Sequence, residues 1–441
     1  MTHVAVVGGG ITGLAAAWEL LGSGARVTLL DAADRLGGRI VTAEVGGRPV
    51  DLGPDAFLSR VPEALELCRQ LGLDSELVSP AADQAFVWVR GRLRRLPAGV
   101  VLGAPTDLVS LARSGVLSPA GLARATLDLV LPASRDGGHD RSVGDLVRAR
   151  LGRQVHERLV DPLVGGIHAG PSELLSVRAT APQLAAAAAE RRSLVAGLRA
   201  QRRASPPAPG PMFHSLREGL ARLVVRLEEE LRAGGVAVEL ATPVKSLAAL
   251  RADATVVAAP ATVAADLLAG SPQAAAELRS IDHASVGLAV LVYPADAFPR
   301  PPVGSGFLVP RREGRLLTAC SFASAKWPHW AAPGQVVLRA SAGRWGDQRA
   351  LAMADEELVG RLHADLADAL GLTDAPSHFR VTRWRDAFPQ YRVGHLERVA
   401  RIEAAVARDL RRVAVAGPAL GGVGIPACIA QGRRAARLVL A

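Results

Sequence analysis

At 441 residues the chain is longer than one hydrophobic core usually supports, so it should form two or three domains. Its apolar content of 49% excludes a disordered protein, and its three widely spaced cysteines suggest neither a disulfide framework nor a zinc site. The net charge of +10 favours an anionic partner. However, its arginine pairs lack interleaved aromatic residues, so we expect no nucleic acid partner.

The chain begins directly with a predicted strand, without a basic leader or a cleavable apolar segment, so we expect a cytoplasmic protein. Its longest charge-free stretch, Val413 to Gly432, is interrupted by several glycines and two prolines. This stretch therefore predicts a strand, a turn and a helix, and we expect no transmembrane segment. Peripheral membrane contact through the apolar middle of the chain is left open.

The first elements predict a dinucleotide-binding unit. Val4 to Val7 form an uncharged, β-branched strand, and a glycine turn from Gly8 to Gly13 leads into a helix from about Thr12 to Leu21. The amino terminus of that helix would face the phosphates of the ligand. A second strand, RVTLL, ends at Asp31, where an acid accepts hydrogen bonds from the ribose hydroxyls.

The next segments contain further glycines and then a helical region. DRLGGR (34–39) and DLGPDA (51–56) allow the backbone to pass close to a ligand. Residues 62–200 are mostly helical by pattern, and the alanine-rich run from Pro182 to Arg203 predicts one amphipathic helix. The proline-rich SPPAPGP (205–211) should end this helical part.

The later segments predict strands of two sheets, one in the nucleotide-binding part and one that is antiparallel. A helix from Leu220 to Ala233, short strands at VAVEL and PVKSL, and a buried strand at TVVAAP return to the nucleotide-binding part. Strand-like runs from Ser285 to Ser341 predict an antiparallel sheet, followed by a helix from Ala354 to Leu370. A last strand, VAVAG, rejoins the first sheet.

These elements predict an α/β fold, α+β overall, with a Rossmann-like FAD-binding domain, an antiparallel-sheet substrate domain and a helical subdomain. We expect a discontinuous FAD-binding domain from residues 1–60, 208–265 and 400–441. The substrate domain would take residues 61–85 and 266–399, and the helical subdomain residues 86–207.

No motif for a metal site or a protein nucleophile occurs, so the chemistry is assigned to a bound cofactor, with no metal and no catalytic side chain. A second glycine segment, Gly421 to Pro426, comes just before a predicted helix from Ala427 to Leu438. The amino terminus of that helix could stabilise negative charge on a reduced ring. Read with the first glycine turn, it favours FAD over a nicotinamide cofactor.

Along its whole length the chain resembles the FAD-dependent protoporphyrinogen and coproporphyrinogen oxidases of haem synthesis, and it is most like the bacterial coproporphyrinogen III oxidases. These belong to the wider amine oxidase-like flavoproteins. Both glycine motifs are shared by many flavoproteins. The runs PLVGGIHAG and FPQYRVGH are more particular to this family.

The resemblance implies which residues contact FAD and the substrate. Val244 would act through its backbone beside the adenine. The candidates for substrate binding are Arg60 and His168, and relatives tend to have tyrosine at the position of His168. The implied FAD contacts come from five parts of the chain: Gly8, Gly9, Gly10, Ile11, Thr12 and Gly13; Asp31, Ala32 and Arg39; Gly53, Pro54, Asp55 and Ala56; Val244 and Trp384; and Val423, Gly424 and Ile425.

The resemblance implies oxidation of a porphyrinogen to a porphyrin by removal of six electrons, with O2 as the acceptor. The basic chain favours coproporphyrinogen III, which has four carboxylates, over protoporphyrinogen IX, which has two. An amine oxidase is disfavoured, because such enzymes commonly place a lysine where this chain has Leu288. The alternative from another functional class is a basic nucleic-acid-binding protein. Such a protein would be colourless, because it would bind no flavin, and its affinity for DNA would fall steeply with salt. A ferrochelatase that receives the product is a further partner to consider.

Overall fold

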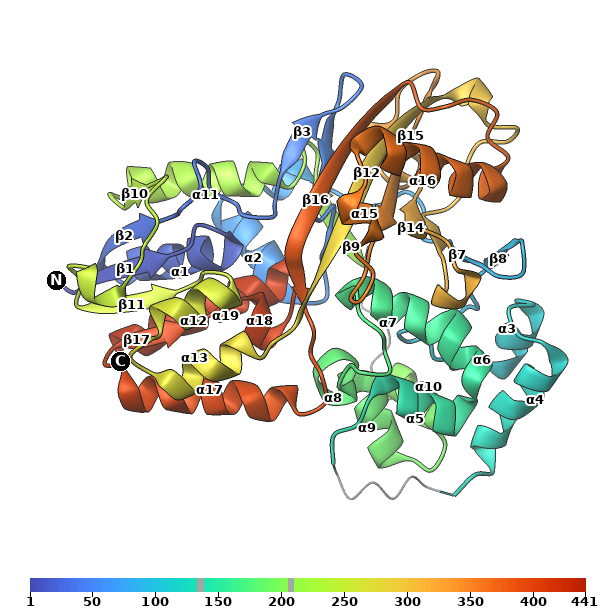
Figure 1. Ribbon diagram of the computed structural model, residues 1–441, viewed down its shortest axis with the longest axis horizontal. Coiled ribbons are helices and arrows are strands. Elements are labelled where there is room, and N and C mark those ends of the chain that lie inside the picture. The colour runs from blue at the N-terminus through green and yellow to red at the C-terminus, as the bar shows by residue number, and fades with distance from the viewer. Residues whose placement is uncertain (133–138, 205–209) are drawn as a thin grey trace.

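The computed structural model describes residues 1–132, 139–204 and 210–441. Figure 1 shows a nucleotide-binding part on the left, a twisted sheet at the upper right and a group of helices at the lower right. Most of the proline-rich junction predicted at residues 205–211 lies outside the described residues.

A five-stranded sheet forms the centre of the first part. Its order is β10-β2-β1-β11-β17, and all four neighbouring pairs are parallel. Segments from the start, middle and end of the chain therefore meet in one sheet. The strands are β1 (His3–Val7), β2 (Arg26–Leu30), β10 (Ala237–Glu239), β11 (Ala254–Val257) and β17 (Val413–Val415).

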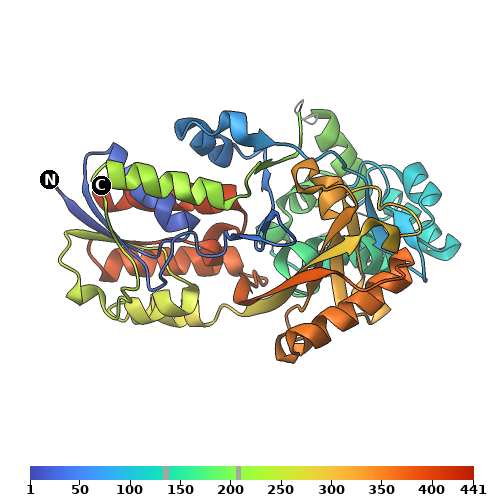
Figure 2. The same cartoon turned by 90° about the horizontal axis from the view of Figure 1, so that it is seen from above.

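Helices cover both faces of this sheet (Figure 2). One hydrophobic core joins it to α1 (Ile11–Gly22), α11 (Ala221–Ala233) and α19 (Ile425–Leu440). Helices α1 and α19 pack closely, because a Cβ on Gly432 would lie 2.1 Å from the Thr12 carbonyl oxygen. A second core is formed with α12 (Ala261–Leu267), α13 (Pro272–Arg279) and α17 (His395–Asp409).

The second sheet has seven strands in the order β16-β12-β15-β14-β13-β7-β8. Its pairs are antiparallel, as predicted, except for the parallel pair of β13 and β7. Helix α16 (Asp355–Leu370) packs on one face. The strands are β7 (Ala85–Trp88), β8 (Leu93–Arg95), β12 (His283–Pro294), β13 (Gly306–Leu308), β14 (Leu317–Ser321), β15 (Gln335–Ala342) and β16 (His378–Pro389).

The hairpin of β3 (Thr42–Glu44) and β4 (Pro49–Asp51) contributes to a core on the other side of this sheet. In Figure 1, β12 and β16 run together from the upper sheet toward the nucleotide-binding part. They thus connect the two parts of the molecule. A small sheet is formed by β5 (Phe57–Leu58), β6 (Leu77–Val78) and β9 (Phe213–Leu216).

The single helix predicted from Pro182 to Arg203 is wrong, because the chain forms α9 (Pro182–Glu190) and α10 (Leu194–Ala204) instead. The buried Asp128 carboxylate accepts hydrogen bonds from the Ser193 hydroxyl at 2.6 Å and the Val195 amide at 2.9 Å. This side chain therefore caps a new helix. Other helices nearby include α3 (Leu108–Arg113), α4 (Pro119–Thr126), α5 (Val143–Leu151), α7 (Asp161–His168) and α8 (Val177–Thr180).

The strand predicted at PVKSL is also wrong, because residues 243–246 have no regular structure. This segment is held instead by two backbone hydrogen bonds just before it, from the Ala241 amide to the Ala33 carbonyl and from the Thr242 amide to the Asp31 carbonyl. Across the described residues, no helix has the length and apolar character needed to cross a bilayer.

Candidate functional site

The first glycine turn is tightly packed on its protein side and open at Gly10. Gly8 has a φ of +110°, and a Cβ there would lie 2.6 Å from the Ala258 carbonyl oxygen. A Cβ on Gly13 would lie 1.8 Å from the Gly8 oxygen, whereas one on Gly10 would meet no protein atom within 4 Å. Because α1 begins at Ile11, the open backbone at Gly10 adjoins its positive amino terminus, which suits a pyrophosphate.

Asp31 lies at the carboxyl end of β2, where the sequence places it. Its carboxylate accepts hydrogen bonds from the backbone amides of Gly9 and Ala33. The bonds from Ala241 and Thr242 bring the segment leading to Val244 beside it. The structure therefore brings the predicted ribose and adenine contacts together next to the glycine turn.

Arg39, Gly53 and Trp384 meet where the nucleotide-binding part joins the second sheet. A Cβ on Gly53 would lie 2.0 Å from the Arg39 carbonyl oxygen. The Arg39 guanidinium donates to the Asp386 carbonyl at 2.9 Å, and the Trp384 indole donates to the Leu52 carbonyl at 2.9 Å. Burial lowers the pKa of Arg39. These three predicted FAD contacts thus belong to one fixed cluster.

Asp55 is engaged by protein side chains. Its Oδ2 lies 3.0 Å from Lys326 Nζ and 2.9 Å from Arg339 Nη1, and it accepts a hydrogen bond from the Trp327 indole at 3.1 Å. Burial alone would raise the pKa of this carboxyl, but the two cations outweigh burial and hold it well below its usual range. Its ion pairs therefore fix the segment Gly53 to Ala56 against β15, an interior strand of the second sheet. Sequence reasoning did not foresee this group.

The second glycine segment is supported by Tyr391. Its hydroxyl donates to the Pro418 carbonyl and accepts a hydrogen bond from the Gly422 amide at 3.0 Å. The Tyr391 ring stacks on His395, with 4.3 Å between ring centroids. Tyr391 therefore fixes the turn that leads to Val423–Ile425 at the start of α19. The run FPQYRVGH was recognised in the sequence, but this role was not.

His168 lies at the end of α7, against the same tyrosine. Its ring centroid is 5.4 Å from that of Tyr391, and its Nδ1 is buried without a hydrogen-bond partner among the described residues. Burial lowers the pKa of His168 to about 4, so the ring is neutral at pH 7. The structure thus brings this predicted substrate residue to the second glycine segment. Arg60, by contrast, is exposed just after β5.

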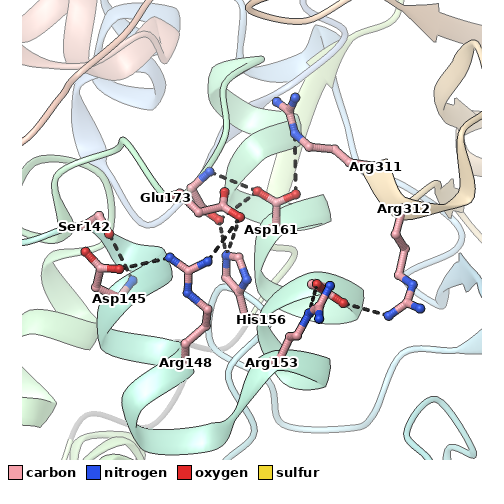
Figure 3. A network of polar contacts seen from close by, with 11 residues as sticks. Ser142, Asp145, Arg148, Arg153, His156, Asp161, Glu173, Arg311 and Arg312 are labelled. Atoms are coloured by element: carbon pink, nitrogen blue, oxygen red, sulfur yellow. Dashed lines mark hydrogen bonds and ion pairs between the residues drawn. The ribbon is translucent and has the colours of Figure 1, made fainter.

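A separate polar network holds α7 in place (Figure 3). His156, Asp161 and Glu173 offer ligand atoms within 4.8 Å of one another, as a metal site would. However, the Ser172 hydroxyl donates to Asp161 at 2.7 Å and bonds His156 at 2.8 Å, and Arg311 lies 3.5 Å from Asp161. These contacts already engage the Asp161 carboxylate and His156 Nε2, so the group is assigned a structural role.

Comparison with known proteins agrees with this arrangement. Residues 11–440 match the family described as flavin containing amine oxidoreductase. The chain belongs to this family. Its fold is accordingly that of the amine oxidase-like flavoproteins, and its cofactor is FAD.

Relatives within the family are similar along the whole chain. The coproporphyrinogen III oxidase of Bacillus subtilis is 34% identical, covering 98% of this chain and 97% of its own length. The coproporphyrinogen III oxidase of Mycobacterium tuberculosis is 37% identical over 99% of this chain and 96% of its own length. A solved structure from Exiguobacterium sp. 255-15, named "Putative protoporphyrinogen oxidase", is 32% identical with a TM-score of 0.88, covering 99% and 98% of the two chains.

The residues of this family member fit FAD. The open backbone at Gly10 leaves room for the pyrophosphate, and Asp31 stands where a ribose would lie. The Arg39 cluster and the turn supported by Tyr391 contain the residues predicted to contact the rest of the cofactor. The individual contacts between these residues and FAD stay predictions.

Proposed function

We propose that this chain oxidises coproporphyrinogen III to coproporphyrin III in haem biosynthesis, in the cytoplasm, with O2 as the electron acceptor. The observation that carries the proposal is the full-length similarity to two relatives named coproporphyrinogen III oxidase. The net charge of +10 suits a substrate with four carboxylates.

Bound FAD would supply the two-electron redox chemistry that links removal of a hydride equivalent from the substrate to reduction of oxygen. The protein's own residues supply position. Gly10 and the start of α1 would bind the pyrophosphate, and Arg39 and Trp384 would hold the middle of the cofactor. The turn supported by Tyr391 would orient its ring end.

His168 would act on the substrate as a neutral hydrogen-bonding group. Its pKa of about 4 keeps the ring uncharged at neutral pH, and its Nδ1 has no partner among the described residues. A neutral imidazole can bind a pyrrole N–H without placing a positive charge beside a macrocycle that is losing hydride. Tyr391 and Gln390 fix this residue, since Gln390 donates to the His168 carbonyl at 2.8 Å.

The overall reaction removes six hydrogen atoms from the porphyrinogen, as three pairs. Each pair reduces one O2 to one H2O2, so three molecules of peroxide form for each porphyrin. This ratio gives a direct test. The purified, flavin-loaded protein should convert coproporphyrinogen III in air to a fluorescent porphyrin with about three peroxides per product. A flavin-loaded protein that accelerates no porphyrin formation would contradict the proposal.

Protoporphyrinogen IX is the second candidate substrate, and the name of the Exiguobacterium structure favours it. It would use the same flavin chemistry with two fewer carboxylates to bind. The protein would therefore discriminate between the two substrates through the groups that bind carboxylates, and not through FAD.

A further inference from the structure

Arg344 carries a half-buried guanidinium that has no acceptor among the described residues. It lies in a tight turn after β15, in which the Asp347 amide donates to the Arg344 carbonyl at 2.9 Å. Its Nε is buried without a hydrogen-bond partner, and its guanidinium forms no ion pair within the described part of the chain. A partly buried cation of this kind is costly unless an anion binds to it.

The two acids that influence Arg344 are already engaged. Asp347 pairs with Arg349 at 2.7 Å, and Asp161 lies 3.5 Å from Arg311. Each pair is neutral, so one positive charge is left unbalanced at Arg344. Burial, with Arg311 adding to it, lowers the pKa of Arg344 to about 10, and the group stays charged at neutral pH.

The turn that carries Arg344 contacts the segment after His168 on one side and β12 on the other. The Trp345 amide donates to the Ala169 carbonyl at 2.6 Å, directly after His168. On the other side, a Cβ on Gly343 would lie 3.1 Å from the Ser285 carbonyl oxygen.

Ser285 leads on to the FAD cluster. Its hydroxyl accepts a hydrogen bond from the Asp386 amide at 2.8 Å, and the Asp386 carbonyl accepts one from Arg39 at 2.9 Å. A continuous set of contacts therefore joins the Arg344 turn to the predicted FAD contact Arg39 and to the predicted substrate contact His168.

We propose that Arg344 binds a carboxylate of the tetrapyrrole substrate. This inference rests on the proposed function and names the residue that recognises the anionic side chain. A guanidinium binds a carboxylate through two parallel hydrogen bonds, and partial burial strengthens them. Arg60 offers the same chemistry from an exposed position, where water competes for it.

The test compares binding of the product, coproporphyrin III, to the FAD-loaded wild-type protein and to Arg344→Gln, followed by fluorescence titration. Loss of a charged, partly buried contact should weaken binding by about tenfold or more and reduce its salt dependence. Arg344→Lys, which keeps the charge, should lose less. Arg361→Gln on the exposed face of α16 is the matched control, because it removes the same charge in the same part of the fold.

Binding by Arg344→Gln within about twofold of wild type, at normal FAD content, would overturn the inference. If that variant does not fold, the wild-type protein gives the answer. Bound coproporphyrin III should protect Arg344 from modification by phenylglyoxal, as read by peptide mass spectrometry, and an unprotected Arg344 would also overturn it. A flavin-loaded wild type that neither binds nor oxidises these tetrapyrroles would instead contradict the proposed function.

Discussion

The two ends of the candidate site are built in different ways. At the nucleotide end, the backbone of Gly8 to Gly13 and the carboxylate of Asp31 lie within one β-α-β unit, and local glycine geometry determines the shape. At the substrate end, His168, Arg344 and Tyr391 come from three distant segments, and only tertiary contacts bring them together. Substitutions should therefore act on cofactor binding at the first end and on substrate handling at the second.

The largest effect is expected from Gly13→Ala at the nucleotide end. The new Cβ would lie 1.8 Å from the Gly8 oxygen, so α1 would have to move away from β1. Overpacking of this kind costs about 3 kcal/mol or more of stability. We expect a protein with little bound FAD and a lower Tm, measured by visible absorbance and thermal unfolding.

Gly22→Ala is the matched control, because a Cβ there would meet nothing within 4 Å at the other end of α1. It should keep the FAD content and Tm of the wild type. Normal flavin content in Gly13→Ala would show that the close packing of this turn is not needed for binding.

Acid should destabilise the folded protein through buried histidines, of which His168 and His395 lie at the substrate end. Burial lowers the pKa of His168, His395 and His329 to about 4, below the 6.5 of a free histidine. The unfolded chain therefore binds more protons between pH 4 and 6.5, and stability should fall as pH decreases through that window. Asp51 acts in the opposite direction, because burial raises its pKa to about 6, but it is one group against three.

Thermal unfolding followed between pH 7.5 and 4.5 measures this effect, and His395→Phe should make the dependence shallower. A Tm that rises as pH decreases from 6.5 to 4.5 would show that these histidines are not held neutral in the folded protein.

A smaller and more selective effect is expected from Tyr391→Phe. The substitution removes the hydroxyl contacts to Pro418 and Gly422 but keeps the stacking on His395. Loss of these hydrogen bonds should cost about 1–3 kcal/mol, through the turn before α19. We expect FAD to remain bound while kcat falls and the flavin spectrum shifts.

Tyr293→Phe provides the comparison, because the Tyr293 hydroxyl on β12 contacts His363 on α16 at 3.2 Å, away from the glycine segment. If both variants keep the wild-type flavin spectrum and kcat, Tyr391 does not position the cofactor.

The smallest effect is expected from Arg60→Ala. An exposed arginine contributes at most about 1 kcal/mol to an ionic contact, so KM for coproporphyrinogen III should rise by no more than about fivefold. Steady-state kinetics in low and high salt measure this change. A larger rise in KM for Arg60→Ala than for Arg344→Gln would assign the main carboxylate contact to Arg60.

The same contrast explains what the sequence could predict. The first glycine turn, Asp31 and the helix before Gly22 follow from local rules, and the structure confirms their placement. The prediction of one alanine-rich helix is wrong, because Asp128, more than fifty residues earlier, caps a second helix within the same stretch of sequence. Local periodicity contains no information about that contact.

The substrate end shows the same limit. Tyr391 lies in a recognised motif, but its contact with Pro418 depends on where the chain returns after β16. The sequence alone does not distinguish Arg60 from Arg344 as a candidate for binding a carboxylate. Only burial and the pairing of nearby acids distinguish them, and both are properties of the folded chain.

We propose that the substrate end of the site is built for a highly anionic porphyrinogen. The most direct test measures kcat/KM for coproporphyrinogen III and protoporphyrinogen IX side by side, by the fluorescence of the porphyrin formed in air. We predict a value at least about tenfold higher for coproporphyrinogen III. An equal or higher value for protoporphyrinogen IX would contradict the claim.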